Sequence, residues 1–187
     1  MAAVPRERFV PPDVRDIAYD DTPLHIGHGQ TISAPSMVAI MCSVLDVRQG
    51  QKVLEVGTGF GYHAAILSLL AKPGTVHTVE RIPELAEHAR GLLKELGYDN
   101  VVVTAGDGSE GLPAFAPYDR ISVAAAAPEV PAPLVDELAD GGRMVIPVGR
   151  YMQELMLVEK AGGRVSTVPR GGVAFVPLLG KFGFKGR

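Results

Sequence analysis

The stretch that decides the fold is Val53-Leu54-Glu55-Val56-Gly57-Thr58-Gly59-Phe60-Gly61-Tyr62. Its first four residues are mostly apolar, which predicts a buried strand, and residues 62–70 have the apolar spacing of a helix. Between them, three glycines let the backbone turn sharply and pass close to a bound molecule at the helix N-terminus. A plain tight turn is the alternative, but the strand before the glycines and the helix after them favour a cofactor site.

The rest of the chain continues this alternation of strands and helices. After the strand over 53–57, short β-branched runs predict strands over 75–80, 101–105, 121–125 and 143–148. The apolar spacing predicts helices over 62–70, 83–96 and 133–139, the last ended by Gly141-Gly142. Strands that are apolar on both faces and alternate with helices predict a mostly parallel sheet covered on both sides, a doubly wound Rossmann-like α/β fold.

The two ends of the chain depart from this pattern. Residues 1–33 are rich in proline and charge, which predicts an irregular arm, and a helix then begins with Ser33 as its N-cap and stops by Gly50. Within residues 149–187, strands are predicted over 154–160 and 173–178. Turns at Gly162-Gly163 and Gly171-Gly172 would join them into an antiparallel edge of the same sheet.

Composition is consistent with one domain spanning residues 1–187. The formal net charge is −3, and 47% of the residues are hydrophobic and 21% charged, as in ordinary globular proteins. The basic residues form no stripe, so no nucleic-acid partner is expected, and no run of about 20 apolar residues predicts a membrane span. Residues 1–8 lack the apolar run of a signal peptide, and the single cysteine, Cys42, cannot form an intramolecular disulfide. A cytoplasmic location is therefore expected.

The residues around the glycines indicate which cofactor is bound. Their spacing is G-x-G-x-G, whereas the dinucleotide fingerprint is G-x-G-x-x-G. Glu55 lies two residues before the first glycine, where a carboxylate suits a cationic ligand such as S-adenosylmethionine better than a pyrophosphate. Glu80 ends the next predicted strand, where it can accept hydrogen bonds from ribose hydroxyls, and Asp107 can reach an adenine amine. A solvated strand end for Glu55 and an Asx-type turn for Asp107 are the alternatives.

Several segments together resemble the protein-L-isoaspartate O-methyltransferase family. The most specific is Ile26-Gly27-His28-Gly29-Gln30-Thr31-Ile32-Ser33-Ala34-Pro35, because the glycine turn is shared by most methyltransferases of this fold. The likeness runs from about Val4 to the C-terminus. It also rests on the motifs at 54–59, 80–85, 106–108, 116–120 and 146–149.

The resemblance implies a methyltransferase domain that transfers the methyl group of S-adenosylmethionine to the free α-carboxyl of L-isoaspartyl residues in damaged proteins. The other product is S-adenosyl-L-homocysteine, and the ester collapses through a succinimide toward normal aspartate. Ser33 matches the family's active-site serine, with Thr31 and Ile32 beside it at the substrate. By position, the family's C-terminal peptide contacts correspond to Val173, Phe175 and Val176. The expected cofactor-binding residues are Glu55, Gly57, Thr58, Gly59, Gly61, His63, Glu80, Arg81, Asp107 and Gly108.

The implied reaction agrees with the residue types present. A carboxylate with a pKa near 4 is already ionised at neutral pH, so methyl transfer to it needs no strong general base. The enzyme has to align the reacting atoms and remove water from the carboxylate, and a hydroxyl such as that of Ser33 can orient it. The five histidines do not have the spacing of metal ligands, so no metal is expected. The chain is expected to be a monomer.

Other interpretations stay open at this point. The acceptor could be a carboxylate on a small molecule or a modified peptide. The chain could bind S-adenosylmethionine without turnover as a partner subunit, against which Ser33, Glu55, Glu80 and Asp107 argue. Tight binding of NAD, with none of S-adenosylmethionine, would instead establish a nicotinamide dehydrogenase. Phe60 replaces a residue that is commonly small or polar in the family, so it is expected either to narrow the cofactor pocket or to face the core.

Overall fold

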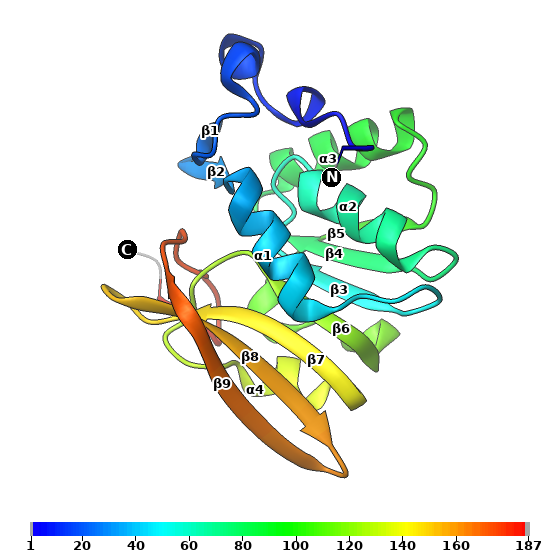
Figure 1. The fold of residues 1–187 in the computed structure, drawn as a ribbon, viewed down its shortest axis with the longest axis vertical. Helices are drawn as coiled ribbons and strands as arrows, with labels where there is room; N and C mark the ends of the chain where they lie inside the picture. Colours follow the sequence, from blue (N-terminus) through cyan, green and yellow to red (C-terminus); the bar gives the residue numbers. More distant parts are fainter. Residues whose placement is uncertain (1, 186–187) are drawn as a thin grey trace.

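A seven-stranded sheet with the strand order β5-β4-β3-β6-β7-β8-β9 forms the centre of the molecule (Figure 1). The structure is a computed structural model that describes residues 2–185. Strands β3 to β7 are parallel to one another, β8 pairs antiparallel with β7, and β9 pairs antiparallel with β8. This arrangement confirms the predicted fold class. The strands are β3 (Val53–Val56), β4 (Val76–Glu80), β5 (Val101–Ala105), β6 (Tyr118–Val123), β7 (Leu138–Val148), β8 (Gln153–Ala161) and β9 (Arg164–Val173).

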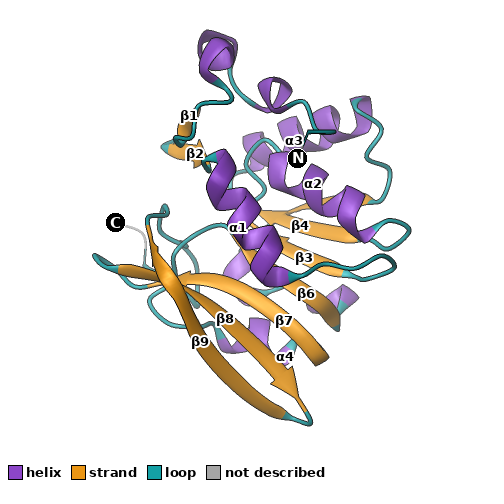
Figure 2. Ribbon diagram, viewed as in Figure 1, coloured by secondary structure: helices purple, strands orange, loops and turns teal. Residues whose placement is uncertain are grey.

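Helices cover both faces of the sheet (Figure 2). On one face, buried residues of α1 (Pro35–Leu45) and α2 (Tyr62–Ala71) pack against the sheet, and α3 (Pro83–Glu95) lies over β4 and β5. The short helix α4 (Ala132–Asp136) and residues 112–116 contribute to the core on the other face. Helix α3 buries Leu85, Ala89 and Leu93, whose spacing of four residues gives a single apolar stripe.

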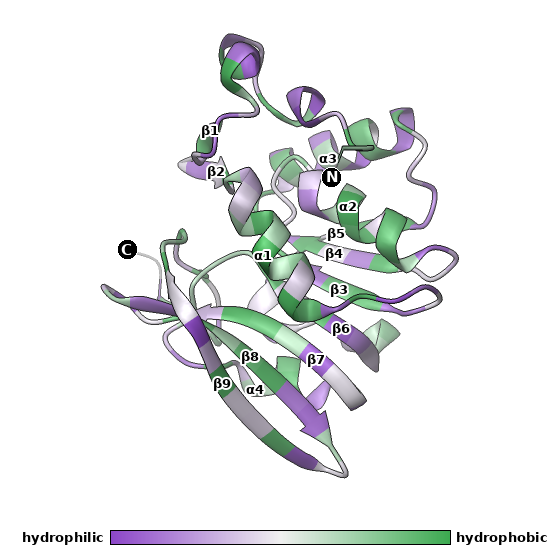
Figure 3. Cartoon of the chain, in the orientation of Figure 1, coloured by the Kyte–Doolittle hydropathy of each residue, from purple (hydrophilic) through white to green (hydrophobic). Residues whose placement is uncertain are grey.

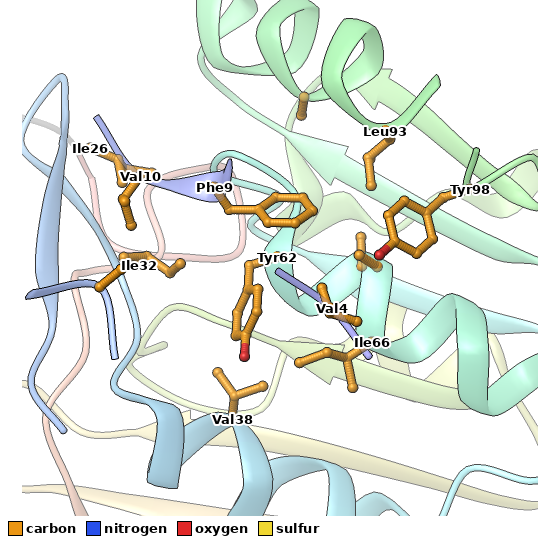
Figure 4. Packing of buried hydrophobic residues seen from close by; sticks show 14 of the residues in the cluster. Val4, Phe9, Val10, Ile26, Ile32, Val38, Tyr62, Ile66, Leu93 and Tyr98 are labelled. Carbon is orange, nitrogen blue, oxygen red and sulfur yellow. The ribbon is translucent and has the colours of Figure 1, made fainter. Parts of the chain in front are cut away.

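Residues 2–33 are more regular than the predicted arm. They contain two 3₁₀ helices, η1 (Arg6–Phe9) and η2 (Pro12–Ile17), and a hairpin of β1 (Leu24–Gly27) and β2 (Gln30–Ile32). The two strands of the hairpin have four and three residues, too few for a period-two pattern to stand out among the prolines and charges. The arm is fixed by apolar contacts, since the ring of Phe9 packs edge-on against Tyr62 at 5.7 Å between centroids (Figure 4).

The prediction that Ser33 caps α1 was wrong. The N-cap is Ala34, which makes no side-chain cap, and a carboxylate from the arm takes this role: Asp21 Oδ1 accepts a hydrogen bond from the Ser36 N–H at 2.9 Å. The Ser33 carbonyl in turn accepts a hydrogen bond from Arg6. Helix α1 ends at Leu45, before the predicted limit at Gly50. The helix start therefore depends on a residue distant in sequence, which local capping preferences do not reveal.

The prediction of a strand over 173–178 was also wrong. Strand β9 ends at Val173, and residues 174–178 instead pair with one residue of the β6–α4 loop. The Ala126 N–H donates to the Val176 carbonyl at 2.8 Å, and the Leu178 N–H donates to the Ala126 carbonyl at 2.7 Å. Gly162-Gly163 does form the turn between β8 and β9, whereas Gly171-Gly172 lies inside β9.

The helix predicted over 133–139 is shorter than expected. It corresponds to α4, which ends at Asp136, and Gly141-Gly142 lies within β7 and does not end the helix. Leu138 is fully buried and pairs with Tyr118 of β6, so tertiary packing draws it into the strand against the helical spacing of the sequence.

Strand β9 is the outer edge of the sheet and is exposed along nearly all of its length. Hydrophilic and hydrophobic residues alternate irregularly along it, whereas the inner strands are dominated by hydrophobic residues (Figure 3). Because both faces of β9 are exposed, its sequence has no clear alternation of apolar and polar residues. Within residues 2–185, no helix is long and apolar enough to span a membrane.

Candidate functional site

Two adjoining cavities lie at the carboxyl ends of the parallel strands, where doubly wound folds bind ligands. The glycine-turn cavity is bounded by the turn after β3, the end of β4, the β1–β2 hairpin and residues 176–179. The serine cavity is bounded by the start of α1, by Pro23 and by residues 174–176. Four residues line both: Thr31, Ser33, Ala124 and Val176. A molecule in one cavity can therefore approach a molecule in the other beside Ser33.

The glycine turn has the backbone conformation that its sequence predicts. Gly57, Gly59 and Gly61 have φ values of 95°, 54° and 96°, in the left-handed region that favours glycine. A Cβ on Gly61 would also lie 3.0 Å from Leu93 of α3, so this glycine allows α2 and α3 to pack closely. Gly57 and Gly59 line the glycine-turn cavity, whereas Gly61 does not.

Glu80 lies at the cavity as predicted. It is 7% exposed and lines the glycine-turn cavity, while two backbone N–H groups hold its carboxylate. Oε2 accepts from Gly59 at 2.9 Å, and Oε1 accepts from Ile82 at 3.0 Å. Each carboxylate oxygen can accept a second hydrogen bond, so Glu80 can bind a pair of ligand hydroxyls without losing these contacts.

Glu55 is fully buried beneath the cavity and does not line it. This excludes a solvated strand end. Its Oε2 accepts a hydrogen bond from Thr78 Oγ1 at 2.5 Å, and Thr78 Oγ1 lies 2.6 Å from Thr58 Oγ1. Thr58 does line the cavity, so a row of two hydroxyls connects the Glu55 carboxyl to the cavity wall.

His63 lies between Glu55 and Cys42. Its Nδ1 is 3.6 Å from Glu55 Oε1 and its Nε2 is 3.4 Å from Cys42 Sγ, while its ring lines the glycine-turn cavity. Burial raises the pKa of Glu55 to about 8 and lowers the pKa of His63 to about 4. Burial also raises the pKa of the Cys42 thiol to about 12, so this cysteine is not a nucleophile at neutral pH.

Asp107 forms the Asx-type turn that was the alternative in the sequence. Its Oδ1 accepts from the Ser109 N–H at 2.9 Å and its Oδ2 accepts from the Lys181 N–H at 2.7 Å. Burial alone would raise the pKa of Asp107, but these bonds and a third from the Ser109 hydroxyl to Oδ1 at 2.7 Å lower it overall. The bond from Lys181 also fastens the C-terminal segment over the end of β5. Asp107 does not line the glycine-turn cavity, whereas its neighbour Gly108 does.

The expected substrate residues come together with one exception. Thr31, Ile32 and Ser33 line the glycine-turn cavity, Phe175 lines the serine cavity, and Val176 lines both. Val173 lines neither and ends β9. The side chain of Gln153 fixes this wall, because Phe175 N–H donates to its Oε1 at 2.7 Å and its Nε2 donates to the Phe175 carbonyl at 3.0 Å.

Two further residues of the cofactor motifs, Phe60 and Arg81, also line the glycine-turn cavity. Phe60 lines the cavity and also packs against the His88 ring of α3 at 4.1 Å between centroids. Arg81 is exposed.

Sequence reasoning missed several lining residues. They are mainly apolar or small, and come from parts of the chain that no motif marks: Pro23, Met37, Ala124, Ala125, Leu178 and Leu179. The only available signal for Ala124 was its place near the carboxyl end of the strand predicted over 121–125, where ligands bind in this fold. Within the described part of the chain, no group of three or more His, Cys, Asp or Glu residues could hold a metal ion.

Known proteins resemble this chain over almost its whole length. The model of the family described as protein-L-isoaspartate(D-aspartate) O-methyltransferase matches residues 1–183. The protein-L-isoaspartate O-methyltransferase of Methanocella arvoryzae is 71% identical over 187 residues, which is 100% of both chains.

Two solved structures are similar over nearly the whole chain. One protein-L-isoaspartate O-methyltransferase matches with a TM-score of 0.87 and 31% identity over 96% of this chain, which spans 60% of that longer chain. A Plasmodium falciparum β-aspartate methyltransferase in complex with S-adenosyl-L-homocysteine matches with a TM-score of 0.85 and 29% identity. That match covers 95% of this chain and 87% of the other.

Proposed function

The chain belongs to the protein-L-isoaspartate(D-aspartate) O-methyltransferase family, and we propose that it performs the family reaction where its two cavities meet at Ser33. The enzyme transfers a methyl group from S-adenosylmethionine to the free α-carboxyl of L-isoaspartyl residues in damaged proteins, which starts their repair. The meeting of the glycine-turn cavity and the serine cavity at Ser33 is the observation that carries the assignment of residues.

The residues of the glycine-turn cavity fit S-adenosylmethionine. Gly57 and Gly59 let the backbone approach it, Glu80 has free acceptor positions for two ribose hydroxyls, and Gly108 borders the place for adenine. The Glu55 carboxyl lies beneath the cavity, with its Oε1 buried and without a hydrogen-bond partner in residues 2–185. A bound cationic ligand would lower the pKa of this carboxyl, so its negative charge would develop together with binding. His63, Thr58 and Arg81 complete the set of contacts.

The serine cavity fits the acceptor. S-adenosylmethionine, when bound, supplies an electrophilic methyl group, and the chain has only to present an ionised carboxylate to it. The Ser33 hydroxyl donates a hydrogen bond that orients the acceptor carboxylate, with Thr31 and Ile32 beside it. Phe175 and Val176 form an apolar wall that excludes water from the nucleophile. No residue has to remove a proton from the acceptor, because its carboxylate is already ionised when it binds.

The same proposal extends to the domain organisation, location and partners of the enzyme. Residues 1–187 act as one methyltransferase domain, in which residues 1–33 carry the substrate segment and 149–187 form the C-terminal wall. The enzyme works as a cytoplasmic monomer on isoaspartyl proteins and peptides, without nucleic acid or membrane as a partner. The single cysteine, Cys42, is half-buried with its Sγ 3.4 Å from His63 Nε2, and the absence of a second cysteine for a disulfide supports a reducing compartment.

The proposal is tested by methyl transfer from labelled S-adenosylmethionine to two synthetic peptides that differ only in L-isoaspartate or L-aspartate. Transfer to the isoaspartyl peptide alone is expected. Ser33→Ala should lower kcat/KM about 10- to 100-fold, as expected for loss of a hydrogen bond to a charged group. Ser43→Ala, on an exposed part of α1, is the matched control and should leave transfer unchanged.

Two outcomes would redirect the proposal. Binding of S-adenosylmethionine with no transfer to either peptide would point to another carboxylate acceptor or to a binding subunit without turnover. Binding of NAD in place of S-adenosylmethionine would establish a dehydrogenase.

A further inference from the structure

One charged side chain of the N-terminal arm is buried directly behind the wall of the two cavities. Arg6 is 0% exposed, and within residues 2–185 no carboxylate forms an ion pair with it. A buried cation without an ion pair is costly, so other groups have to compensate for its lost hydration.

The compensating groups come from three separate parts of the chain. Arg6 Nε donates to the Ala18 carbonyl of the arm at 2.6 Å, and Nη2 donates to the Ser33 carbonyl at 2.7 Å. The guanidinium also lies over the ring of Tyr62, with Cζ 4.7 Å from the centroid. Tyr62 is the first residue of α2, directly after the glycine turn, and Figure 4 shows it packed beside Phe9 of the arm.

The contact with Ser33 fixes the orientation of a whole peptide group. The Ser33–Ala34 bond is trans, so its N–H points away from its carbonyl, and the carbonyl faces Arg6. Among the residues that the structure describes, the Ala34 N–H has no acceptor, and Ala34 lines the serine cavity. The same peptide group therefore joins the buried guanidinium on one side to the acceptor cavity on the other.

A hydrogen bond from a charged donor also polarises this peptide group. Withdrawal of electron density from the carbonyl makes the N–H on the opposite side a stronger donor toward an anion. The acceptor carboxylate proposed for the serine cavity is such an anion.

We infer that Arg6 is a positioning residue for methyl transfer, which holds the Ser33–Ala34 peptide against the cofactor-binding turn and directs its N–H to the acceptor carboxylate. The inference rests on the proposed function. It assigns to the arm a role in binding the isoaspartyl carboxylate, while the cofactor is bound by other residues.

Steady-state kinetics with the isoaspartyl peptide and calorimetric binding of S-adenosyl-L-homocysteine test this role in the full chain. Arg6→Gln should lower kcat/KM for the peptide about 10- to 100-fold, because a charge-assisted hydrogen bond is lost. The dissociation constant for S-adenosyl-L-homocysteine should stay within about threefold, since Arg6 acts on the acceptor side. Arg8→Gln, in the same 3₁₀ helix but paired at the surface with Glu95, is the control and should change neither quantity.

Chemical rescue separates positioning from a purely structural role. Arg6→Ala should regain peptide methylation when millimolar guanidinium chloride is added, and sodium chloride at the same ionic strength should not restore it. Hydrogen exchange gives a readout without turnover: Arg6→Lys, which lacks the planar fork, should speed exchange in residues 31–34 and leave residues 57–61 unchanged.

The inference is overturned if Arg6→Gln weakens S-adenosyl-L-homocysteine binding by the same factor as peptide kcat/KM, or if peptide kcat/KM stays within twofold of the original chain. If Arg6→Gln does not fold, Arg6→Lys takes its place under the same criteria. Failure of the proposed function looks different, because the unmodified chain itself would then methylate neither peptide.

Discussion

At the scale of single residues, the row formed by Glu55, Thr78 and Thr58 places an acidic group where water cannot reach it. Glu55 is the only charged residue of β3, where it pairs with Thr78 of β4 on one side and with Ser122 of β6 on the other. The Ser122 hydroxyl is buried and, within residues 2–185, has no hydrogen-bond partner. The Glu55 carboxyl therefore holds its proton more tightly than an exposed one.

This burial predicts an unusual pH dependence of stability. Glu55 keeps its proton in the folded chain up to about pH 8, whereas in the unfolded chain it ionises near 4.5, so it makes stability fall as pH rises between these values. His63 acts in the opposite direction between about pH 4 and 6.5, because its folded pKa is lowered. The two effects oppose each other below pH 6.5, and Glu55 acts alone above it.

Urea unfolding of the ligand-free chain at pH 6.5 and pH 8 measures the effect. The free energy of unfolding should fall by on the order of 2 kcal/mol over this range, the linkage expected for one proton over 1.5 pH units. Glu55→Gln cannot ionise and should lose this decrease. An equal decrease in both proteins would show that Glu55 is not its source.

Glu80 should contribute directly to cofactor affinity. Glu80→Gln replaces one oxygen by an amide that cannot accept from the Gly59 or Ile82 N–H, so the turn loses a contact and the ligand loses an acceptor. Binding of S-adenosyl-L-homocysteine, measured by calorimetry, should weaken about tenfold. Glu84→Gln, exposed on α3, is the matched control. Unchanged affinity in Glu80→Gln would remove Glu80 from the site.

At the scale of elements, the parallel core was predictable and the segments around the site were not. Strands β3 to β7 and helices α2 and α3 follow apolar patterns that local sequence carries. The cap of α1 comes from Asp21 and the pairing of Val176 comes from Ala126, both contacts between distant parts of the chain. Glu80 and the glycine turn were placed correctly because strand ends in this fold meet at one edge. Lining residues such as Met37 carry no polar signal.

The wall of the serine cavity should depend on Gln153. Its amide makes two hydrogen bonds to the Phe175 backbone, two residues beyond the end of β9. These bonds resemble the pairing of one further residue in the sheet. Gln153→Ala should raise KM for the isoaspartyl peptide several-fold and destabilise the chain by about 1–3 kcal/mol, the range for two such bonds. Kinetics and urea unfolding measure both effects, with the exposed Gln49→Ala as control. An unaltered KM would mean that the wall holds without Gln153.

At the scale of the whole molecule, the two cavities join three parts of the chain that are far apart in sequence. The hairpin of the arm, the glycine turn of the core and residues 176–179 all border the glycine-turn cavity. A ligand bound there makes contacts that exist only when all three are in place, so it should stabilise the complete fold.

Thermal unfolding with and without ligand tests this linkage. S-adenosyl-L-homocysteine at 100 times its dissociation constant should add about 2.7 kcal/mol, which corresponds to a rise in Tm of roughly 5–10 °C for a chain of this size. NAD at the same concentration should leave Tm unchanged. The opposite pattern, a rise with NAD only, would contradict the cofactor assignment.

The exposed edge strand β9 affects whether the enzyme aggregates with its own protein substrates. Damaged, partly unfolded chains readily add to open sheet edges, and an enzyme that must meet them risks being trapped in aggregates. Pro169 offers no N–H to a new strand, Gly171 has a φ of 116°, and Arg164 and Arg170 bring charge to the edge. These features disfavour the pairing of another chain with β9 and so protect this edge of the sheet against aggregation.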